Sequence, residues 1–498
     1  MAKSIKIIGA GISGLSAGCY LQMNGYDTEI FEMNDIPGGL CTSWERKGYT
    51  IDTCIHWLVG SSPSEKLYDL WNELIDMEKL DFVDFEEYLR VEDRNGNIMR
   101  VPTNIDELEK EWLEKAPEDE KLIREFANAV RRFLKFEMPV KRAPELYSPL
   151  DVIKMLFRMI PYGRSFKKWI SISTGDFIKK FENSLLRKTI LFMFVPEMSV
   201  LFLIFTLAWM HKKTAGYPIG GSLKFSRLIE KKYLDLGGKI RYSSRVKKIL
   251  TDNNKACGVD LDNGESYAAD MVISAADGYS TIFEMLEGKY TDRKIKNYYE
   301  NYLIFPSYLQ VSLGVARTFD EAPHHLYFPL DEALKLGDET VHKYIGVRIF
   351  NFDPTLSPEN RTVLTVMLPT FNHTYWQELR NKDRAVYKTE KRRIADKVID
   401  ALDYKFGKIR SNLEVLDIST PATVIRYTNN WKGSFEGWML TPETGMKSMK
   451  KTLPGLDHFY MIGQWVQPGG GLPAVLKSGR DVAQIICKKD KKRFKSDS

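Results

Sequence analysis

Residues 4–14 read SIKIIGAGISG, and this stretch decides the fold. An isoleucine-rich run leads directly into three glycines, Gly9, Gly11 and Gly14. Apolar residues then recur at helical spacing up to Gly25, and residues 26–32 read as a second strand. A strand, a glycine turn, a helix and a second strand in this order predict a βαβ unit, and therefore an α/β fold with a Rossmann-like sheet.

The glycine turn predicts a dinucleotide site. Gly9 permits the tight turn, and Gly11 lets a pyrophosphate approach the backbone. Gly14 lets the helix pack on the strand, while free N–H groups of the turn, which includes Ser13, hold the anion. Glu32 closes the second strand, where a carboxylate accepts a hydrogen bond from a ribose hydroxyl and repels the 2′-phosphate of NADP. This unit alone leaves FAD and NAD both open.

Composition narrows the class of protein. A chain of 498 residues with a net charge of +6 is large enough for two or three domains and lacks the basic bias of a nucleic-acid-binding protein. Its five cysteines show no CxxC spacing, so we expect neither a disulfide framework nor a zinc site. We therefore expect the protein to be located in the reducing cytoplasm. The N-terminal apolar run continues into the glycine turn, which argues against a signal peptide. Pro196 and Glu197 interrupt residues 190–210, so we expect a buried helix there rather than a membrane span.

Further glycine-rich motifs extend the pattern along the chain. The second begins PGGL and contains the pair Gly38 and Gly39, shortly after Glu32. With the N-terminal unit, these motifs resemble the amine oxidase and phytoene desaturase superfamily of FAD enzymes over nearly the whole chain. Within it, three other segments resemble phytoene desaturases, prolycopene isomerases and retinol saturases more than amine oxidases. The motifs lie at residues 36–44, 217–222, 269–275 and 459–472, and the three segments at 306–314, 324–327 and 420–438.

The resemblance implies a set of FAD contacts. In such relatives a strand residue at the position of Val246 touches the adenine through its backbone, and the last glycine motif approaches the rest of the cofactor. Gln464 stands where many relatives carry an acid that binds the ribityl chain, and an amide can still bond a hydroxyl. The implied contacts are Gly9, Gly11, Ser13, Gly14, Glu32, Gly38, Gly39, Leu40, Val246, Gly463, Gln464, Gly470, Gly471 and Leu472.

The motifs also divide the chain. If they meet in one sheet, residues 1–80, 217–280 and 455–490 form a discontinuous FAD-binding domain. Residues 81–216 and 281–454 are then an inserted mixed α+β substrate domain, with strands expected at 309–315, 344–350 and 363–368. Residues 239–249 and 255–261 read as a hairpin, and residues 491–498 form a basic tail.

Two apolar segments point to a hydrophobic substrate. Residues 148–169 mix apolar and basic side chains, which suits either an interfacial segment on a membrane or a surface helix with snorkelling cations. An aromatic run that contains Phe202, Phe205 and Trp209 leads to Tyr217, and we expect these four residues in the wall of an apolar tunnel rather than only in the core.

Few catalytic side chains are expected, because the flavin itself performs hydride transfer. His56 and Trp57 follow a segment that passes close to the flavin in relatives, and His56 could position or exchange a proton near physiological pH, although a structural histidine is an equal alternative. His324 and His325 are adjacent on a strand and point to opposite faces, so no metal site is expected. Because no second GxGxxG holds a nicotinamide, we expect a transient electron partner such as a quinone, oxygen or a soluble reductant.

The sequence therefore predicts an FAD-dependent desaturase, saturase or isomerase that transfers hydride at flavin N5 to or from a polyene or isoprenoid, in the cytoplasm or peripherally on the inner face of the membrane. Two alternatives stay open: an amine-oxidase-like enzyme for a smaller polar substrate, and a flavin-binding membrane-surface protein without turnover.

Overall fold

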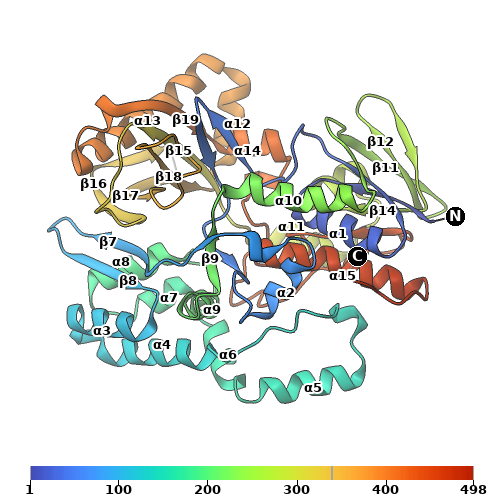
Figure 1. The fold of residues 1–498 in the computed structure, drawn as a ribbon, viewed down its shortest axis with the longest axis horizontal. Helices are drawn as coiled ribbons and strands as arrows, with labels where there is room; N and C mark the ends of the chain where they lie inside the picture. The colour runs from blue at the N-terminus through green and yellow to red at the C-terminus, as the bar shows by residue number, and fades with distance from the viewer. Residues whose placement is uncertain (1, 338–339, 497–498) are drawn as a thin grey trace.

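The structure is a computed structural model that describes residues 2–337 and 340–496; the last two residues of the predicted basic tail lie outside this range. Two large sheets form the upper half of the view in Figure 1, and a group of helices lies below them. Both ends of the described chain lie beside the smaller of these two sheets (Figure 1).

The smaller of the two is a five-stranded parallel sheet in the order β10-β2-β1-β14-β20. Its strands come from segments far apart in the sequence, which is the arrangement that the scattered motifs predicted. The predicted βαβ unit consists of β1, α1 and β2. The strands are β1 (Ser4–Ile8), β2 (Asp27–Phe31), β10 (Lys239–Arg241), β14 (Met271–Ser274) and β20 (Phe459–Met461).

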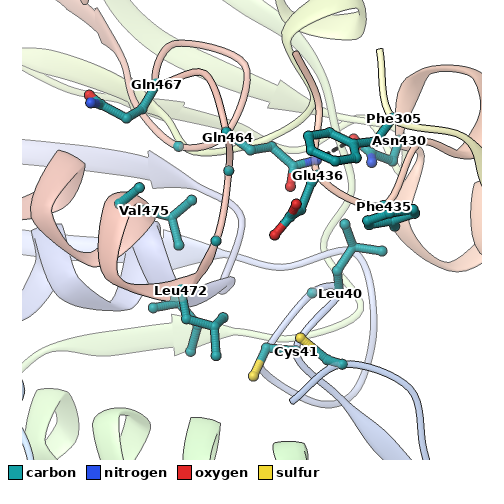
Figure 2. A pocket seen from close by; sticks show the side chains of 18 of the residues that line it. Leu40, Cys41, Phe305, Asn430, Phe435, Glu436, Gln464, Gln467, Leu472 and Val475 are labelled. Carbon is teal, nitrogen blue, oxygen red and sulfur yellow. Dashed lines mark hydrogen bonds between the residues drawn. The ribbon is translucent and has the colours of Figure 1, made fainter. Parts of the chain in front are cut away.

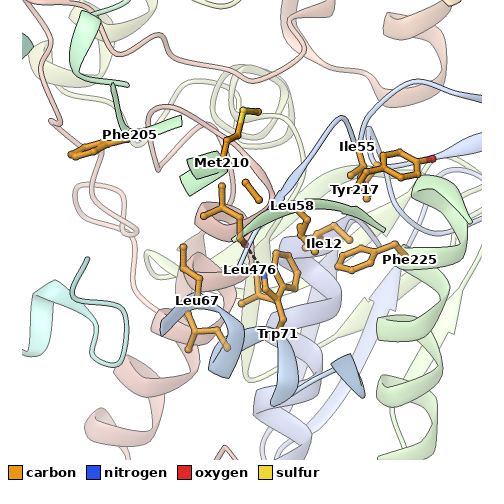
Figure 3. Packing of buried hydrophobic residues seen from close by; sticks show 14 of the residues in the cluster. Ile12, Ile55, Leu58, Leu67, Trp71, Phe205, Met210, Tyr217, Phe225 and Leu476 are labelled. Carbon is orange, nitrogen blue, oxygen red and sulfur yellow. Dashed lines mark hydrogen bonds between the residues drawn. The ribbon is translucent and has the colours of Figure 1, made fainter. Parts of the chain in front are cut away.

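Three helices pack on this sheet: α1 (Ile12–Met23), α10 (Gly221–Asp235) and α15 (Leu472–Lys489). Small residues let α1 and α15 approach closely, since a Cβ on Gly479 would lie 2.6 Å from the Ser13 carbonyl oxygen. Ile12, Trp71 and Leu476 meet in the apolar core between these helices (Figure 3). The N-termini of α1 and α15 are thereby fixed next to each other.

The predicted hairpin at residues 239–249 is only partly correct. Residues 239–241 form β10 at the edge of the parallel sheet, and a new strand, β11 (Val246–Asp252), pairs antiparallel with β12 (Lys255–Leu261). Ser243 has a φ of 51° and turns the chain out of the parallel sheet between them. β13 (Ser266–Ala268) completes this small three-stranded sheet.

The larger sheet has seven strands in the order β19-β15-β18-β17-β16-β7-β8. β15, β17 and β18 cover the three strands that the sequence predicted for the inserted region. One face of the sheet is apolar and packs on α13 (Arg384–Phe406). The bounds are β7 (Glu87–Glu92), β8 (Ile98–Pro102), β15 (Ser307–Val315), β16 (His325–Leu336), β17 (Thr340–Ile349), β18 (Thr362–Thr370) and β19 (Leu413–Ser419).

The chain breaks at Pro196 as predicted, into α8 (Ser184–Met193) and α9 (Val200–His211). Within the described residues, no helix combines the length and the apolar character needed to cross a bilayer. The remaining helices are α2 (Lys66–Asn72), α3 (Ile105–Lys115), α4 (Glu120–Phe133), α5 (Pro149–Met159), α6 (Gly163–Ile170), α7 (Thr174–Ile178), α11 (Arg293–Asn301), α12 (His373–Lys382) and α14 (Pro421–Thr428). The remaining strands are β3 (Ser43–Arg46), β4 (Tyr49–Asp52), β5 (Leu58–Val59), β6 (Phe82–Val83) and β9 (Ala215–Pro218).

Candidate functional site

A cavity of about 1250 Å³ is lined by residues of both large sheets and of the helices below them. Its volume exceeds the roughly 300–1,000 Å³ of most small-molecule pockets. It is therefore large enough for two ligands in one space. Its lining includes thirteen of the fourteen predicted FAD contacts, all except Gly14, together with both predicted catalytic residues and three of the four predicted tunnel residues.

Two helix N-termini open into one end of this cavity. Gly11 precedes α1 and Gly471 precedes α15, and neither helix has a side-chain cap on its first N–H groups. Uncapped N–H groups and the positive ends of two helix dipoles favour an anion. This end of the cavity is suited to phosphate groups.

The glycines of the first turn differ in what surrounds them. A Cβ on Gly14 would lie 2.0 Å from the Gly9 carbonyl oxygen, so a side chain there is incompatible with the turn. A Cβ on Gly11 would meet only the Gly38 carbonyl oxygen, at 3.8 Å. The space at Gly11 is free for a ligand, and the space at Gly14 is required by the fold, as the motif predicts.

Glu32 lies at the end of β2 and lines the cavity. One carboxylate oxygen accepts a hydrogen bond from the Ala10 N–H at 2.8 Å, and the other accepts one from the Asn34 N–H at 2.9 Å. Burial raises the pKa of Glu32 and these hydrogen bonds oppose that rise. Ser244 and Val246 line the same end of the cavity, close to the start of β11.

Glu436 is a site residue that we did not predict. It projects into the space above Leu40, next to the last glycine motif (Figure 2). Burial raises its pKa to about 7, and a hydrogen bond from the Gly471 backbone opposes this. Gln464, beside it, donates to the Asn430 side chain at 3.2 Å. Glu436 and Gln464 bring polar groups to the middle of the cavity.

The opposite end of the cavity is aromatic. Phe202, Phe205 and Trp209 project from α9, and Phe205 stacks on Phe136 with ring centroids 5.3 Å apart. The lining continues through Pro144 and Tyr147 to Met155 of α5. The apolar wall therefore extends from the glycine motifs to a helix at the lower edge of the molecule (Figure 1).

Tyr217 is a correction to the predicted tunnel. It is absent from the cavity lining within the described chain, and its hydroxyl donates to Asp353 at 3.0 Å. Its strand, β9, pairs with both β5 and β6, which fixes the side chain in the core. Tyr217 therefore supports the framework behind the cavity.

His56 and Trp57 line the cavity beside a cluster of nitrogen-bearing side chains from β16 and β17. His325 and Arg348 are register partners on these strands and both face the cavity, whereas His324 stacks on Phe85 at 3.7 Å. His324 precedes β16, so the expected alternation along a strand does not apply to this pair, and the two histidine rings lie 6.4 Å apart. Burial, together with the positive charge of Arg348, holds the pKa of His56 well below 6.5, so its neutral form faces the cavity at neutral pH.

Arg348 was missed although the sequence contains a signal for it. Along β17, Ile345, Val347 and Ile349 face the apolar core, and Tyr344, Gly346 and Arg348 alternate with them. A charged residue in the alternate register of a buried strand points to a lined cavity. Among the described residues, no group of three or more His, Cys, Asp or Glu side chains could hold a metal.

The chain is similar in sequence to two proteins named for carotenoid-like compounds. Prolycopene isomerase from Daucus carota is 26% identical over 95% of this chain and 78% of its own length. A 4,4'-diaponeurosporene oxygenase from Staphylococcus aureus is 24% identical over 99% of this chain and its full length.

The fold has solved counterparts. Cyclohexylamine oxidase from Brevibacterium oxydans matches 99% of this chain and 100% of its own with a TM-score of 0.61, at 15% identity. The family model for flavin containing amine oxidoreductase matches residues 12–487. The chain therefore belongs to the flavin containing amine oxidoreductase family and is an FAD-dependent enzyme.

Proposed function

We propose that FAD lies along the glycine-lined side of the cavity. The pyrophosphate would be held by the N-termini of α1 and α15, with Gly11, Ser13 and Gly471 against it. Glu32 would accept a hydrogen bond from the ribose, and the Val246 backbone would meet the adenine. Gly38, Gly39, Leu40, Gln464 and Leu472 would surround the ribityl and ring portions. The positions of the uncapped helix ends and the free space at Gly11 support this assignment.

This placement agrees with a division of the chain into two domains. The parallel sheet with α1, α10 and α15 would be the FAD-binding domain, built from residues 1–80, 217–280 and 455–490. The seven-stranded sheet and the lower helices would be the substrate domain, built from 81–216 and 281–454. The cavity would then lie between a cofactor wall and a substrate wall.

We propose that the enzyme acts on a carotenoid-like or isoprenoid substrate. The observation that carries this proposal is the continuous apolar wall from the glycine motifs past Phe202, Phe205 and Trp209 to Met155. The two relatives named for carotenoid substrates also support it, because the chain covers most or all of their length. A long hydrocarbon chain can lie along such a wall, because the chain itself has no polar groups that need hydrogen-bond partners.

Bound isoalloxazine supplies hydride chemistry at N5. The protein's own residues would hold a substrate C–H against it and exclude water, which is a positioning role for the α9 aromatics and Trp57. Neutral His56 can donate one hydrogen bond into the cavity. Desaturation, saturation and isomerisation all fit this arrangement, and electrons would be exchanged with a transient partner such as a quinone, oxygen or a soluble reductant.

Anaerobic spectroscopy of the purified holoenzyme separates these reactions. A polyene that is desaturated reduces the oxidised flavin, and one that is saturated reoxidises the photoreduced flavin. An isomerised polyene leaves the flavin spectrum unchanged while chromatography shows a new geometric isomer. Flavin that responds to none of a set of acyclic polyenes, in either redox state and without isomerisation, would contradict the proposal.

The amine-oxidase alternative is tested in the same cuvette. It is favoured by the solved fold relatives that oxidise amines, according to their names. A protonated amine would, however, lie in a cavity that already contains the guanidinium of Arg348. We expect small primary and secondary amines to leave the oxidised flavin unchanged, and rapid bleaching by them would replace our proposal.

We further propose that α5 contacts an anionic membrane surface, through which the substrate enters. The helix is well defined, because Ser148 and Asp151 form a capping box and Pro149 occupies its first turn. None of its residues is buried. Its exposed apolar side chains include Leu156 and Phe157, which are 60% and 68% exposed.

The position of α5 favours a lipid partner over chance exposure. Lys154 and Arg158 lie one helical turn apart on α5, beside the apolar stripe, and can meet anionic headgroups. Met155, on the same helix, lines the cavity. A substrate leaving the bilayer at α5 would therefore reach the aromatic wall without crossing water.

Vesicle flotation tests this proposal. Wild-type protein should float with vesicles of phosphatidylcholine and phosphatidylglycerol at low salt and partly dissociate as salt rises. The double variant Leu156→Gln, Phe157→Gln should lose most of this binding. Leu234→Gln is the matched control, because Leu234 is 46% exposed on α10, away from α5. Equal flotation of the double variant and the control would contradict the lipid contact.

A further inference from the structure

One part of the cavity wall is polar in a way that a hydrocarbon substrate does not explain. On the cavity face of the seven-stranded sheet, His325 of β16 lies directly opposite Arg348 of β17. Side chains opposite each other on antiparallel strands share a face and lie close together. Tyr327 and Gly346 form the next pair on this face, and the missing side chain of Gly346 makes room for the Tyr327 ring.

Two of these nitrogen-bearing side chains, Arg348 and His325, are incompletely partnered in the part of the chain that the structure describes. Among the described residues, no carboxylate forms an ion pair with Arg348. His325 is 7% exposed, and its Nδ1 has no hydrogen-bond partner in the described chain. The negative charge of Asp52 raises the pKa of Arg348, but its oxygens already accept hydrogen bonds from Ser222 and the Cys54 N–H.

A second cavity beside Arg348 does not supply the missing partner. It measures about 10 Å³, which is at most the size of one water molecule. Asp84 also lines it, but forms no ion pair with Arg348 in the described structure, and burial raises the pKa of Asp84. A counter-ion for the guanidinium must therefore enter from the large cavity.

We infer that Arg348, with His325 and His56 beside it, binds the carboxylate end of an amphiphilic substrate or product whose apolar chain lies along the aromatic wall. This inference rests on the proposed function and names a narrower substrate class. A guanidinium binds a carboxylate through two parallel hydrogen bonds, and a buried charge without a partner is otherwise costly.

The charge of the cluster fits a single carboxylate. Burial and Arg348 hold the pKa values of His56 and His325 well below 6.5, so both rings are neutral hydrogen-bonding groups at neutral pH. The cluster therefore carries the one positive charge of Arg348. Phe192 stacks on Tyr327 with centroids 4.5 Å apart, so an aromatic surface begins directly beside the polar cluster.

Binding of matched probes to the holoenzyme tests the inference without requiring turnover. Oleic acid, methyl oleate and oleyl alcohol share one chain length and differ in the end group. Their dissociation constants can be measured from changes in tryptophan or flavin fluorescence. We expect the acid to bind at least about tenfold more tightly than the ester and the alcohol, which corresponds to about 1.4 kcal/mol.

Variants of Arg348 assign this preference to the cluster. Arg348→Met should abolish the preference for the acid, keep ester binding and FAD content, and leave the melting temperature unchanged or raised, since a half-buried charge without an ion-pair partner is removed. Arg348→Lys should keep part of the preference. Lys343→Met is the control, because it removes an exposed charge from the same strand.

Three results would overturn the inference: equal binding of acid and ester, an acid preference that survives Arg348→Met, or loss of FAD or of folding in that variant. The last result would assign Arg348 to the cofactor or to the fold. Turnover of hydrocarbon polyenes without any acid preference would reject this inference and leave the proposed function standing. Acid binding without polyene chemistry would do the reverse.

Discussion

The two ends of the cavity are built from different parts of the chain. At the end where we propose the cofactor, backbone N–H groups at the starts of α1 and α15 face the cavity, and glycines keep side chains away. At the substrate end the lining consists of side chains from α9, β16 and β17, among them Phe205 and Arg348. In the proposed arrangement, backbone groups at one end would recognise a cofactor that does not vary, and side chains at the other end could change with the substrate.

The largest expected effect on FAD binding comes from a substitution at Gly11. Gly11→Val should give folded but colourless protein, because the new side chain fills the space beside the backbone that a pyrophosphate needs. We expect FAD affinity to fall by about a hundredfold or more, or about 2.7 kcal/mol. Flavin absorbance after gel filtration measures it. Gly163→Val is the control, since a Cβ there meets no atom within 4 Å, and a yellow Gly11→Val protein would contradict the assignment.

A large truncation at the other end of the cavity should instead lower stability and leave FAD bound. Phe205→Ala removes a side chain that is 4% exposed and packs on Phe133 and Phe136, so unfolding should become easier by about 3–5 kcal/mol. FAD should stay bound, and the preferred chain length of the substrate should change. Urea unfolding compares it with Phe371→Ala, whose side chain is 58% exposed and should cost little. Loss of FAD in Phe205→Ala would mean that the two ends are not separable.

Glu436 lies where the two ends meet, and its burial predicts a pH dependence. Its pKa in the folded protein is raised from 4.5 to about 7, so the folded state keeps a proton that the unfolded chain releases between these values. The contribution of this proton to stability is complete below pH 4.5 and is lost as pH rises through about 7, which amounts to about 3 kcal/mol. Glu436→Gln should abolish this loss.

Urea unfolding of the apoprotein at low and high pH measures the difference between Glu436→Gln and wild type. The variant should gain stability relative to wild type as the pH rises. Glu443→Gln serves as a control, because this residue is exposed in the same region of the chain. A constant difference between the two proteins at all pH values would show that Glu436 does not titrate in this range.

The smallest expected effect is a loss of FAD affinity on substitution of Glu32. Glu32→Gln keeps the shape of the side chain but removes its charge, and it replaces one acceptor oxygen by a donor beside Ala10 or Asn34. We expect FAD binding to weaken by about 1.5–3 kcal/mol, the usual range for a hydrogen bond to a charged group. Titration of the apoprotein with FAD measures this. An unchanged affinity would remove Glu32 from the predicted contacts.

The difference between the two ends of the cavity also explains which site residues the sequence could predict. Gly9, Gly11 and Gly14 act through local backbone geometry, so a short motif is enough to predict their arrangement, and the parallel sheet with it. Arg348 and His325 become neighbours only through the register of two strands. Tyr217 was assigned to the wall from its position next to the aromatic run, but pairing of β9 with β5 and β6 turns it into the core. Long-range pairing of this kind leaves no local pattern.

The edge position of β20 has a consequence for biosynthesis. Residues 459–461 complete a sheet whose first strand is residues 4–8, and the last glycine motif and α15 follow them. A ribosome that has produced the first four hundred residues has therefore made the parallel sheet without one edge strand and without α15, one of the two helices proposed to hold the pyrophosphate. With FAD in the proposed site, its capture would wait for the final part of translation, and chains that end early would be left with an exposed strand edge for chaperones or proteases to recognise.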